Sequence, residues 1–371
     1  MEALNYFITP MASYGMIKQI SYRKLELPMV KPFRIALGAT KSYEGFLVSV
    51  TTDDGITGYG EATTTPFITG DTLGSIEYEL KFFSEVLIGK EESPEQLNEL
   101  MKSLLKGSKA SRNAIDCALW DIIGKRAKTN VRKVLGNYRN KISTSYTVDL
   151  VEPKLARKQA EDLLSQGIQV FKIKMGSGLE EDLERARVVR DVKGLEKMVY
   201  VDFNQAYTAR KTIEISRKLA SLNIEFLEQP VPMHDIRGLK FARQRSDIPI
   251  FADEAIFSTD DVVNVLENEA ADGINIKLMK SGGITEAIKM ASVAEAYRAP
   301  VMIGCMVETR VANTAGLAVA LSRSAVKYSD LDGYSSIIED IASDGITLTN
   351  GEVSGPDIPG VGVGLKEKYA K

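Results

Sequence analysis

The sequence predicts a TIM-like parallel (β/α) barrel of seven or eight strands, preceded by a smaller α+β domain. Two observations carry this prediction. The first third of the chain begins with short strands and then turns helical. From about residue 141, apolar strands alternate with amphipathic helices at a spacing of roughly 25 residues, which is typical of repeated βα units. Units of this kind build a closed parallel sheet surrounded by helices.

The N-terminal part contains three predicted strands, at residues 17–26, 44–52 and 56–61, with a turn at Asp53-Asp54-Gly55. After Gly70 the pattern becomes helical. Residues 76–87, 94–105 and 111–127 carry apolar side chains at three- and four-residue spacing. Strands followed by helices predict a compact α+β domain.

The barrel prediction comes from eight short apolar segments with amphipathic helices between them. The strands are expected at residues 143–148, 170–174, 198–202, 224–228, 248–253, 273–278, 300–306 and 327–331. The helices are expected at residues 152–166, 179–192, 208–222, 259–268, 284–297 and 310–322. Active-site groups of such barrels lie at the C-terminal ends of the strands, so the residues that end each strand are the first candidates for a site.

Composition favours a soluble globular protein. Hydrophobic residues make up 44% of the 371 residues and charged residues 26%. The net charge of −3 comes without a basic stripe, so we expect no binding to nucleic acid or to a membrane surface. No apolar stretch approaches the roughly 20 residues of a membrane span. The N-terminus lacks the pattern of a signal peptide, so we expect a cytoplasmic protein.

Cysteine and histidine are too scarce for several kinds of site. Cys117 and Cys305 lie outside any CxxC pattern, which argues against a disulfide framework and a zinc–thiolate site. His234 is the one histidine, so a histidine metal cluster is excluded. Acid–base chemistry would then fall to Lys, Asp, Glu or Tyr.

Three carboxylates end three consecutive predicted strands. They are Asp202, Glu228 and Asp253, spaced by 26 and 25 positions (228 − 202 and 253 − 228). Carboxylates that converge at a barrel mouth repel one another unless a cation joins them. Ligands that offer only oxygen suit Mg²⁺, with Mn²⁺ as a substitute. The sequence therefore predicts a magnesium site.

Lysines lie on either side of the carboxylates in strand order. Lys172 and Lys174 are two residues apart on the second strand, so both point to the same side of it. Lys277 lies on the sixth strand, which faces the second across an eight-stranded barrel. A lysine near a dication and other lysines should have a lowered pKa and could act as a base. A metal would hold a substrate carboxylate and stabilise an enolate, while one base on each face permits racemisation or epimerisation.

These residues together resemble the enolase superfamily, in its muconate-lactonizing-enzyme subgroup. The motifs that carry the resemblance are Lys172-Ile173-Lys174, Val201-Asp202-Phe203-Asn204, Glu228-Gln229-Pro230, Asp253-Glu254 and Ile276-Lys277. The resemblance implies one Mg²⁺ per subunit on Asp202, Glu228 and Asp253, with Lys174 and Lys277 as the acid–base pair. It implies that Lys172 neutralises the substrate carboxylate. It also implies a capping domain at residues 17–140, a catalytic barrel at 141–335 and a C-terminal segment, 336–371, that returns to the cap.

Residues at the end of the predicted eighth strand indicate which reaction of the superfamily to expect. Asp330 and Asp332 form an Asp-x-Asp pair that resembles the dipeptide epimerases, where it holds the ammonium of the N-terminal residue. Two carboxylates on one side of the chain suit a cationic amine. Thr147 and the backbone from Cys305 to Val307 match the positions that hold the dipeptide in these relatives. The expected activity is therefore epimerisation of the C-terminal residue of L-Ala-L-Xaa dipeptides.

Two segments of the expected cap resemble the mobile loops that select the substrate in these relatives, namely residues 31–38 and 63–72. Relatives that act on Ala-Glu dipeptides carry Arg where Gly38 aligns, which argues against a Glu side chain here. Phe67 and Ile68 favour an apolar or aromatic C-terminal residue. Arg34, if it points inward, would restore a preference for an anion.

Other reactions remain open at this point. The same scaffold could serve a muconate cycloisomerase, an o-succinylbenzoate synthase or an N-acylamino acid racemase, whose substrates make no use of Asp330 and Asp332. A Schiff-base aldolase using Lys174 or Lys277 and a non-catalytic binding protein are further alternatives. Barrel proteins of this kind often self-associate, so we expect a homo-oligomer. Residues 1–16 have no predicted role.

Overall fold

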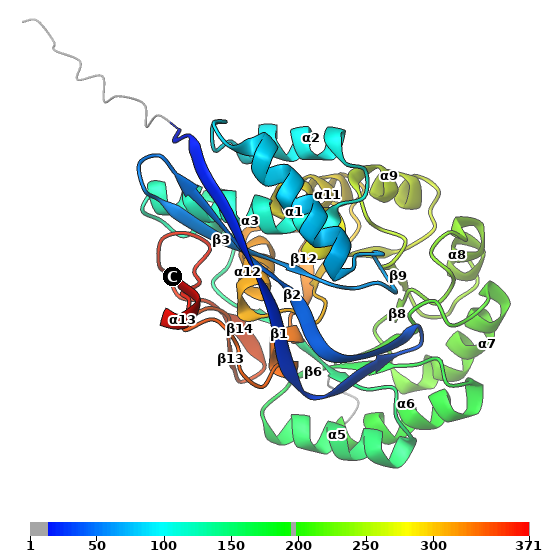
Figure 1. The fold of residues 1–371 in the computed structure, drawn as a ribbon. Coiled ribbons are helices and arrows are strands. Elements are labelled where there is room, and N and C mark those ends of the chain that lie inside the picture. Colours follow the sequence, from blue (N-terminus) through cyan, green and yellow to red (C-terminus); the bar gives the residue numbers. More distant parts are fainter. Residues whose placement is uncertain (1–13, 194–197, 371) are drawn as a thin grey trace, which may run out of the picture.

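An antiparallel sheet of three strands begins the structure, a computed structural model that describes residues 14–193 and 198–370 (Figure 1). Its strands are β1 (Ile17–Ile35), β2 (Gly38–Thr52) and β3 (Thr57–Thr63). The first two strands are longer than expected because they continue as a hairpin through residues 31–38, where a loop was predicted. Backbone pairing persists there, with Ile35 opposite Gly38, so the segment is a ribbon rather than an irregular loop.

Four helices follow the sheet: α1 (Leu73–Leu87), α2 (Pro94–Leu104), α3 (Lys109–Arg126) and α4 (Val131–Leu135). The first three were predicted. The fourth was missed because five residues are too few to show a period; Asn130 caps it by accepting a hydrogen bond from the Arg132 amide. Apolar side chains of the sheet and the helices form one core, which includes Phe46, Val48, Phe83 and Ala114.

The second half of the chain forms an eight-stranded parallel sheet in consecutive order, which confirms the predicted barrel. Its strands are β5 (Ser145–Val148), β6 (Val170–Lys174), β7 (Met198–Asp202), β8 (Leu227–Glu228), β9 (Ile250–Ala252), β10 (Gly273–Lys277), β11 (Val301–Gly304) and β12 (Val326–Asp330). A parallel bridge between Thr144 and Ser329 joins the first strand to the last.

Helices surround the barrel strands. They are α5 (Pro153–Ser165), α6 (Leu179–Lys193), α7 (Ala209–Leu219), α8 (Ile236–Arg243), α9 (Thr259–Glu267), α10 (Leu278–Ser281), α11 (Ile284–Ala296) and α12 (Arg310–Ser322), with a short 3₁₀ turn, η1 (Ala220–Leu222), after α7. The sequence did not predict α8, whose eight residues bury only Leu239 and Ala242, or the single turn of α10. In the described residues, no helix is both long and apolar enough to cross a membrane.

The C-terminal segment packs against both parts of the molecule. It contains η2 (Gly333–Ser336), β13 (Thr347–Thr349), β14 (Glu352–Ser354) and α13 (Glu367–Ala370). β14 pairs with β4 (Ile142–Ser143), so the strand predicted at 143–148 is split between two sheets. Ile341 and Val363 pack with Leu27 and Tyr43 of the first sheet. The segment thus returns to the N-terminal domain (Figure 1).

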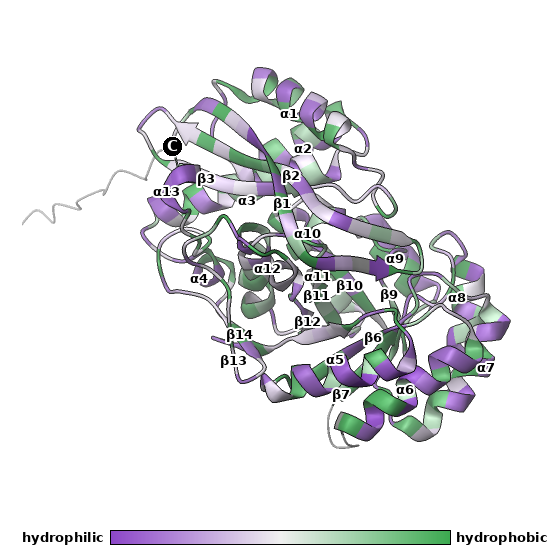
Figure 2. Cartoon of the chain, turned by 60° about the horizontal axis from the view of Figure 1, so that its bottom comes forward, coloured by the Kyte–Doolittle hydropathy of each residue, from purple (hydrophilic) through white to green (hydrophobic). Residues whose placement is uncertain are grey.

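Aromatic rings form a floor inside the barrel. Tyr200, Phe226 and Phe251 each lie two residues before a strand-end carboxylate, and period-two alternation turns both members of each pair inward. The rings stack, with centroids 4.4 Å apart for Tyr200 and Phe226 and 4.1 Å apart for Phe226 and Phe251. The surrounding helices α6 and α7 carry both hydrophilic and hydrophobic residues along their length (Figure 2). Charges at the mouth therefore rest on an apolar layer.

Candidate active site

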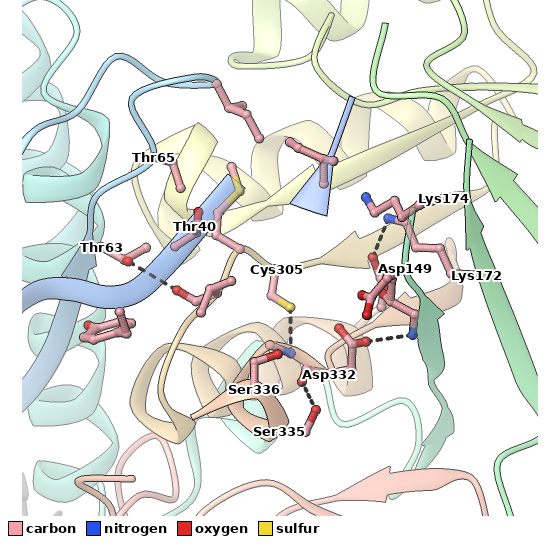
Figure 3. A pocket seen from close by; sticks show the side chains of 18 of the residues that line it. Thr40, Thr63, Thr65, Asp149, Lys172, Lys174, Cys305, Asp332, Ser335 and Ser336 are labelled. Carbon is pink, nitrogen blue, oxygen red and sulfur yellow. Dashed lines mark hydrogen bonds and ion pairs between the residues drawn. The ribbon is translucent and has the colours of Figure 1, made fainter. Parts of the chain in front are cut away.

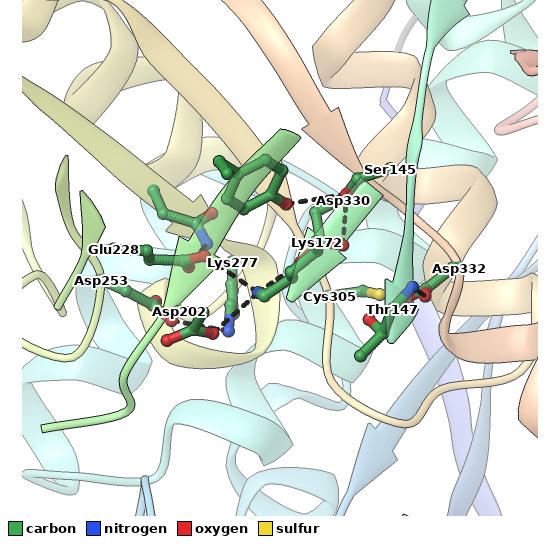
Figure 4. A network of polar contacts seen from close by, with 12 residues as sticks. Ser145, Thr147, Lys172, Asp202, Glu228, Asp253, Lys277, Cys305, Asp330 and Asp332 are labelled. Carbon is green, nitrogen blue, oxygen red and sulfur yellow. Dashed lines mark hydrogen bonds and ion pairs between the residues drawn. The ribbon is translucent and has the colours of Figure 1, made fainter. Parts of the chain in front are cut away.

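The three strand-end carboxylates converge at the barrel mouth (Figure 4). Asp202 ends β7, Glu228 ends β8, and Asp253 follows β9. Each side chain is fully buried, and one oxygen from each lies within 4.8 Å of the others. The predicted trio is therefore one cluster.

Lys172 lies at the centre of this cluster. Its Nζ is 2.9 Å from Asp202 Oδ2, 3.0 Å from Glu228 Oε2 and 2.8 Å from Asp330 Oδ2. The resemblance implied that Lys172 neutralises a substrate carboxylate, whereas here it is paired with three carboxylates of the protein. Burial acts to lower the pKa of Lys172, but the charges of Asp202 and Asp330 outweigh it and raise the pKa well above its ordinary value.

The other two lysines flank the carboxylates from opposed strands. Lys174 Nζ is 2.7 Å from Asp202 Oδ2, and Lys277 Nζ is 2.8 Å from Asp253 Oδ2. Their strands, β6 and β10, are the second and the sixth in the order of the sheet. The amines therefore approach the cluster from two sides, as the strand order predicted.

Ionisation of the cluster follows from burial and from its mixed charges. Burial, together with the neighbouring charge of Asp202, raises the pKa of Glu228 to about 8. Burial also acts to raise the pKa of Asp253, but the ammonium groups of Lys277 and Lys280 outweigh it and hold that pKa below its usual range. For Lys277 burial acts downward, yet the charge of Asp253 raises its pKa. The sequence predicted a lowered lysine pKa because a dication would repel the ammonium. For Lys277 the negative charge of Asp253 raises the pKa instead.

The donor set fits a hard divalent cation. Glu228 Oε2 and Asp253 Oδ2 are buried and accept no hydrogen bond, although each lies within ion-pair distance of a lysine. An acceptor oxygen buried without a donor is costly. Asp202 joins these two carboxylates in one buried group of oxygen donors, and such a group without sulfur or imidazole could hold Mg²⁺.

Several supporting residues were not singled out from the sequence. Asn275 Nδ2 donates to Glu228 Oε1 at 2.6 Å. Asn204 accepts from Lys174 Nζ at 3.0 Å and donates to Glu254 Oε1 at 3.0 Å. Both asparagines lie two residues from a predicted site residue on the same strand end, so alternation was a signal that could have found them.

Gln229 and Lys280 hold Asp253. Gln229 Oε1 accepts from the amides of Asp253 at 2.8 Å and Ala255 at 3.1 Å, while its own φ is 35°. A non-glycine residue in this left-handed region is uncommon and marks a position held by its surroundings. Lys280 Nζ donates to both Asp253 Oδ1 and the Asp253 carbonyl oxygen. The orientation of the third carboxylate is therefore fixed from two sides.

The Asp-x-Asp pair lines the same cavity, but its two carboxylates differ. Both oxygens of Asp330 are engaged, one by Ser145 Oγ at 2.7 Å and one by Lys172 Nζ at 2.8 Å. Asp332 accepts a hydrogen bond through Oδ2 from the Thr147 amide at 3.0 Å. Burial and the charge of Asp330 raise the pKa of Asp332 to about 6. Of the two, Asp332 is better placed to receive a further donor.

The predicted strand-seven residues contact both the cap and the segment that follows the eighth strand. The carbonyl oxygen of Val307 accepts from Thr63 Oγ1 of the cap at 3.2 Å. Cys305 is buried, and its Sγ accepts from the Gly333 amide at 3.3 Å. Burial raises the pKa of the Cys305 thiol well above its ordinary value, which agrees with a packing role for its side chain.

A cavity of about 400 Å³ joins these groups under the cap (Figure 3). Its barrel wall includes Lys172, Lys174, Lys277, Asp330 and Asp332, and its cap wall includes Ile35, Gly38, Thr40, Thr65, Phe67 and Ile68. Arg34 is exposed and does not line the cavity, so it offers no inward cation.

Comparison with known proteins places the chain in a family. The model described as the N-terminal domain of mandelate racemase and muconate lactonizing enzyme matches residues 19–136, and the enolase C-terminal domain-like model matches residues 155–369. The hydrophobic dipeptide epimerase of Enterococcus faecalis is 34% identical over 318 residues, which are 85% of this chain and 90% of that protein. The L-Ala-D/L-Glu epimerase of Bacillus subtilis is 35% identical over 94% of this chain and 96% of its own length.

Two further similarities bear on the reaction. The N-succinyl-L-Arg/Lys racemase of Bacillus cereus is 33% identical over 88% of this chain and 90% of its own length. A crystal structure of the Enterococcus faecalis dipeptide epimerase, complexed with Mg and the dipeptide L-Leu-L-Tyr, has a TM-score of 0.92 at 32% identity and covers 94% of this chain and 99% of that one. These relatives are named as epimerases or racemases, which are isomerases, and the solved structure shares the fold. The chain belongs to the enolase superfamily, in the branch of mandelate racemase and muconate lactonizing enzyme, and is an isomerase of that superfamily.

Proposed function

We propose that the protein is a Mg²⁺-dependent dipeptide epimerase that inverts the α-carbon of the C-terminal residue of L-Ala-L-Xaa dipeptides. The observation that carries the proposal is the placement of Lys174 and Lys277 on opposed strands, on either side of one carboxylate cluster. The same cavity contains Asp332, which suits the dipeptide's ammonium. Relatives named as dipeptide epimerases support the reaction class.

In the proposed mechanism, Asp332 binds the free ammonium of the substrate, with the Thr147 amide orienting its carboxylate. The substrate α-carbon then lies between Lys174 Nζ and Lys277 Nζ. One amine, neutral at the start, takes the α-proton from one face. The other, protonated at the start, returns a proton to the opposite face, so that the configuration inverts.

Asp202, Glu228 and Asp253 would hold Mg²⁺ through oxygens that include Glu228 Oε2 and Asp253 Oδ2. When bound, Mg²⁺ supplies positive charge at the substrate carboxylate, where negative charge accumulates as the α-proton leaves. Lys172 holds the ligand carboxylates together.

Proton exchange in D₂O tests the proposal. The protein is incubated with Mg²⁺ and a panel of L-Ala-L-Xaa dipeptides, and the mass and configuration of each dipeptide are followed. We expect deuterium at the α-carbon of the C-terminal residue and formation of the epimer, both abolished by EDTA and restored by Mg²⁺. An enzyme that incorporates no deuterium into any dipeptide would refute the proposed substrate class.

Lysine variants test the two-base mechanism. Lys174→Ala and Lys277→Ala should each lower the rate of epimerisation by about 10²- to 10⁴-fold, because one face loses its acid or base. Each variant should retain exchange of the α-proton of only one epimer. Lys289→Ala is the control, because this lysine pairs with Glu95 on the protein surface. Full two-way turnover by Lys277→Ala would contradict the mechanism.

N-acylamino acid racemisation is the second candidate. One observation favours it: both oxygens of Asp330 already accept from Ser145 or Lys172, so Asp332 is the carboxylate better placed for an amine. The racemase of Bacillus cereus shows that the scaffold supports such a reaction in a relative. Asp332→Asn should impair turnover of free-amine dipeptides but spare N-succinyl amino acids. A wild-type preference for N-succinyl amino acids would favour this candidate over the first.

A further inference from the structure

The two carboxylates of the Asp-x-Asp pair have different partners. Asp330 ends β12 and lies between Ser145 of β5 and Lys172 of β6 (Figure 4). Asp332 lies apart from them, beside the Thr147 amide (Figure 4). Asp330 is therefore the member of the pair that is joined to the lysine at the centre of the carboxylate cluster.

The ammonium of Lys172 makes its hydrogen bond with Asp330. Its Nζ donates to Asp330 Oδ2 at 2.8 Å and lies 2.9 Å from Asp202 Oδ2 and 3.0 Å from Glu228 Oε2. Glu228 Oε2 nevertheless accepts no hydrogen bond, so its contact with the ammonium is electrostatic alone. Asp330 thus directs an N–H of Lys172 away from an oxygen that the proposed metal would use.

Asp330 is itself held by a chain of hydrogen bonds. Ser145 Oγ donates to Asp330 Oδ1 at 2.7 Å and lies 2.7 Å from the hydroxyl of Tyr200. Because the single proton of the Ser145 hydroxyl is used on Asp330, the Tyr200 hydroxyl is the donor to Ser145. The Tyr200 ring stacks on Phe226 in the aromatic floor. All three hydrogen-bonded side chains are buried, so the carboxylate has a fixed position.

Charge explains what a further carboxylate contributes here. A buried ammonium needs anionic partners. If Asp202 and Glu228 were the partners of Lys172, the ammonium would compete with a divalent cation for their oxygens. Asp330 is an anion outside the group of three carboxylates that could hold the metal, so Lys172 keeps a partner when those oxygens are used by a cation.

We infer that Asp330 is a positioning residue, which holds Lys172 for the metal site and does not bind the ammonium of the substrate. Recognition of that ammonium then falls to Asp332. The resemblance to the dipeptide epimerases had implied that both carboxylates hold the amine. The inference rests on the proposed function for the identity of the cation and of the substrate.

Calorimetric titration of the protein with Mg²⁺, without substrate, tests this. Asp330→Asn should raise the Kd for Mg²⁺ by about tenfold or more, because a neutral side chain holds the ammonium less strongly. Asp332→Asn is the matched control and should leave the Kd unchanged. Burial raises the pKa of Asp332 to about 6, so at pH 8 this control also removes one negative charge from the cavity. An unchanged Kd in folded Asp330→Asn, or an equal rise in both variants, would overturn the inference.

A double-mutant cycle shows whether Asp330 acts through Lys172. In the Lys172→Met background, Asp330→Asn should have little effect on the Kd for Mg²⁺, because the ammonium that Asp330 holds is absent. Additive effects of the two substitutions would overturn the positioning role.

Rescue by Mg²⁺ provides a measurement that needs no lysine variant. Excess Mg²⁺ should restore most of the kcat/KM of Asp330→Asn for free-amine dipeptides, but not that of Asp332→Asn, whose defect lies in binding the amine. A loss in Asp330→Asn that Mg²⁺ does not restore would assign Asp330 to the ammonium and overturn the inference. The titration uses no substrate, so a protein that binds Mg²⁺ but exchanges no dipeptide proton would refute the proposed function alone.

Discussion

At the scale of single residues, side chains outside the reaction decide where the reacting groups lie. Alternation along the strands puts an aromatic ring beneath each carboxylate, and the apolar floor contributes to the raised pKa of Glu228. Gln229 then holds the next carboxylate in place through the amides of Asp253 and Ala255. The Gln229 side-chain oxygen thus satisfies two buried backbone amides, which in a regular sheet would donate to a neighbouring strand.

Gln229→Leu should destabilise the protein. Leucine offers no acceptor, so the buried amides of Asp253 and Ala255 lose their hydrogen bonds. We expect the free energy of unfolding to fall by about 2 to 4 kcal/mol, measured by urea denaturation. Gln244→Leu is the control, because Gln244 is an exposed residue at the end of α8. Equal stability of Gln229→Leu and wild type would contradict this account.

Gly333→Ala should disturb the proposed amine site at Asp332. A Cβ at Gly333 would lie 2.1 Å from the Met306 carbonyl oxygen and 3.0 Å from Cys305 Sγ, so the segment after Asp332 would have to move. Because misplacement by about 1 Å can cost about a hundredfold in rate, kcat/KM for dipeptides should fall steeply. Gly74→Ala is a matched control, since a Cβ there meets no atom within 4 Å. Equal kcat/KM for the two variants would show that the close contact is irrelevant to the site.

At the scale of elements, the β1–β2 hairpin connects the cap to the barrel beside the cavity. The ammonium of Lys31 pairs with Asp149, which follows β5 and is 8% exposed in its side chain. Gln159 of α5 fixes that aspartate, donating to Oδ2 at 3.0 Å and accepting from its amide at 3.0 Å. The partner of Lys31 is therefore rigid, and the pair restrains the hairpin.

Asp149→Asn should loosen the hairpin without unfolding the protein. Asparagine can keep the hydrogen bonds to Gln159 but loses the charge that attracts Lys31. We expect faster amide hydrogen exchange across residues 29–40, measured by mass spectrometry, and a smaller effect of the mutation in high salt. Asp357→Asn breaks an exposed pair with Lys133 and serves as the control. Unchanged exchange in the hairpin would show that the ion pair does not restrain it.

At the scale of the whole molecule, buried carboxylates of the cap hold the N-termini of two barrel helices. Glu61 of β3 accepts from the amides of Thr309 at 2.8 Å and Ala312 at 3.1 Å, at the start of α12. Asp116 of α3 accepts from the Thr285 amide at 2.9 Å, at the start of α11. Helix N-termini favour negative charge, so these contacts join the two domains through the ends of barrel helices.

Asp116→Asn should change how stability depends on pH. Burial raises the pKa of Asp116 from 3.8 to about 6, against the opposing effects of its hydrogen bonds with Thr285 and the charge of Arg112. A carboxyl group with a raised pKa stabilises the fold below about pH 4, and this contribution is lost as the pH rises through 6. Relative to the variant, wild type should lose about 2 to 3 kcal/mol of unfolding free energy across that window.

Urea denaturation at intervals between pH 4 and 7 measures this difference. Asp247→Asn, which changes an exposed aspartate, should leave the pH profile of wild type unaltered. Parallel profiles for wild type and Asp116→Asn would show that Asp116 keeps its ordinary affinity for protons.

The sequence by itself determined the barrel and the strand-end charges. Periodicity is a local property, so the bounds of β6 and β7 matched the prediction, and β10 differed by one residue. Strand order then placed Lys174 and Lys277 on opposite sides of three carboxylates, because the ends of parallel strands meet at one face. Short helices such as α4 and α10 were not predicted, because four or five residues are too few to show a helical repeat of apolar residues.

The tertiary structure alone decided which partner each side chain takes. Lys172 could face a substrate or the protein's own carboxylates, and the fold brings Asp330 within 2.8 Å of it across 158 positions of sequence. Neither the hydrogen bond from Ser145 to Asp330 nor Asp116 at the start of α11 follows from a local pattern. The physical reason is that hydrogen bonds, ion pairs and close contacts depend on distances of a few ångströms between elements, which packing sets and periodicity does not contain.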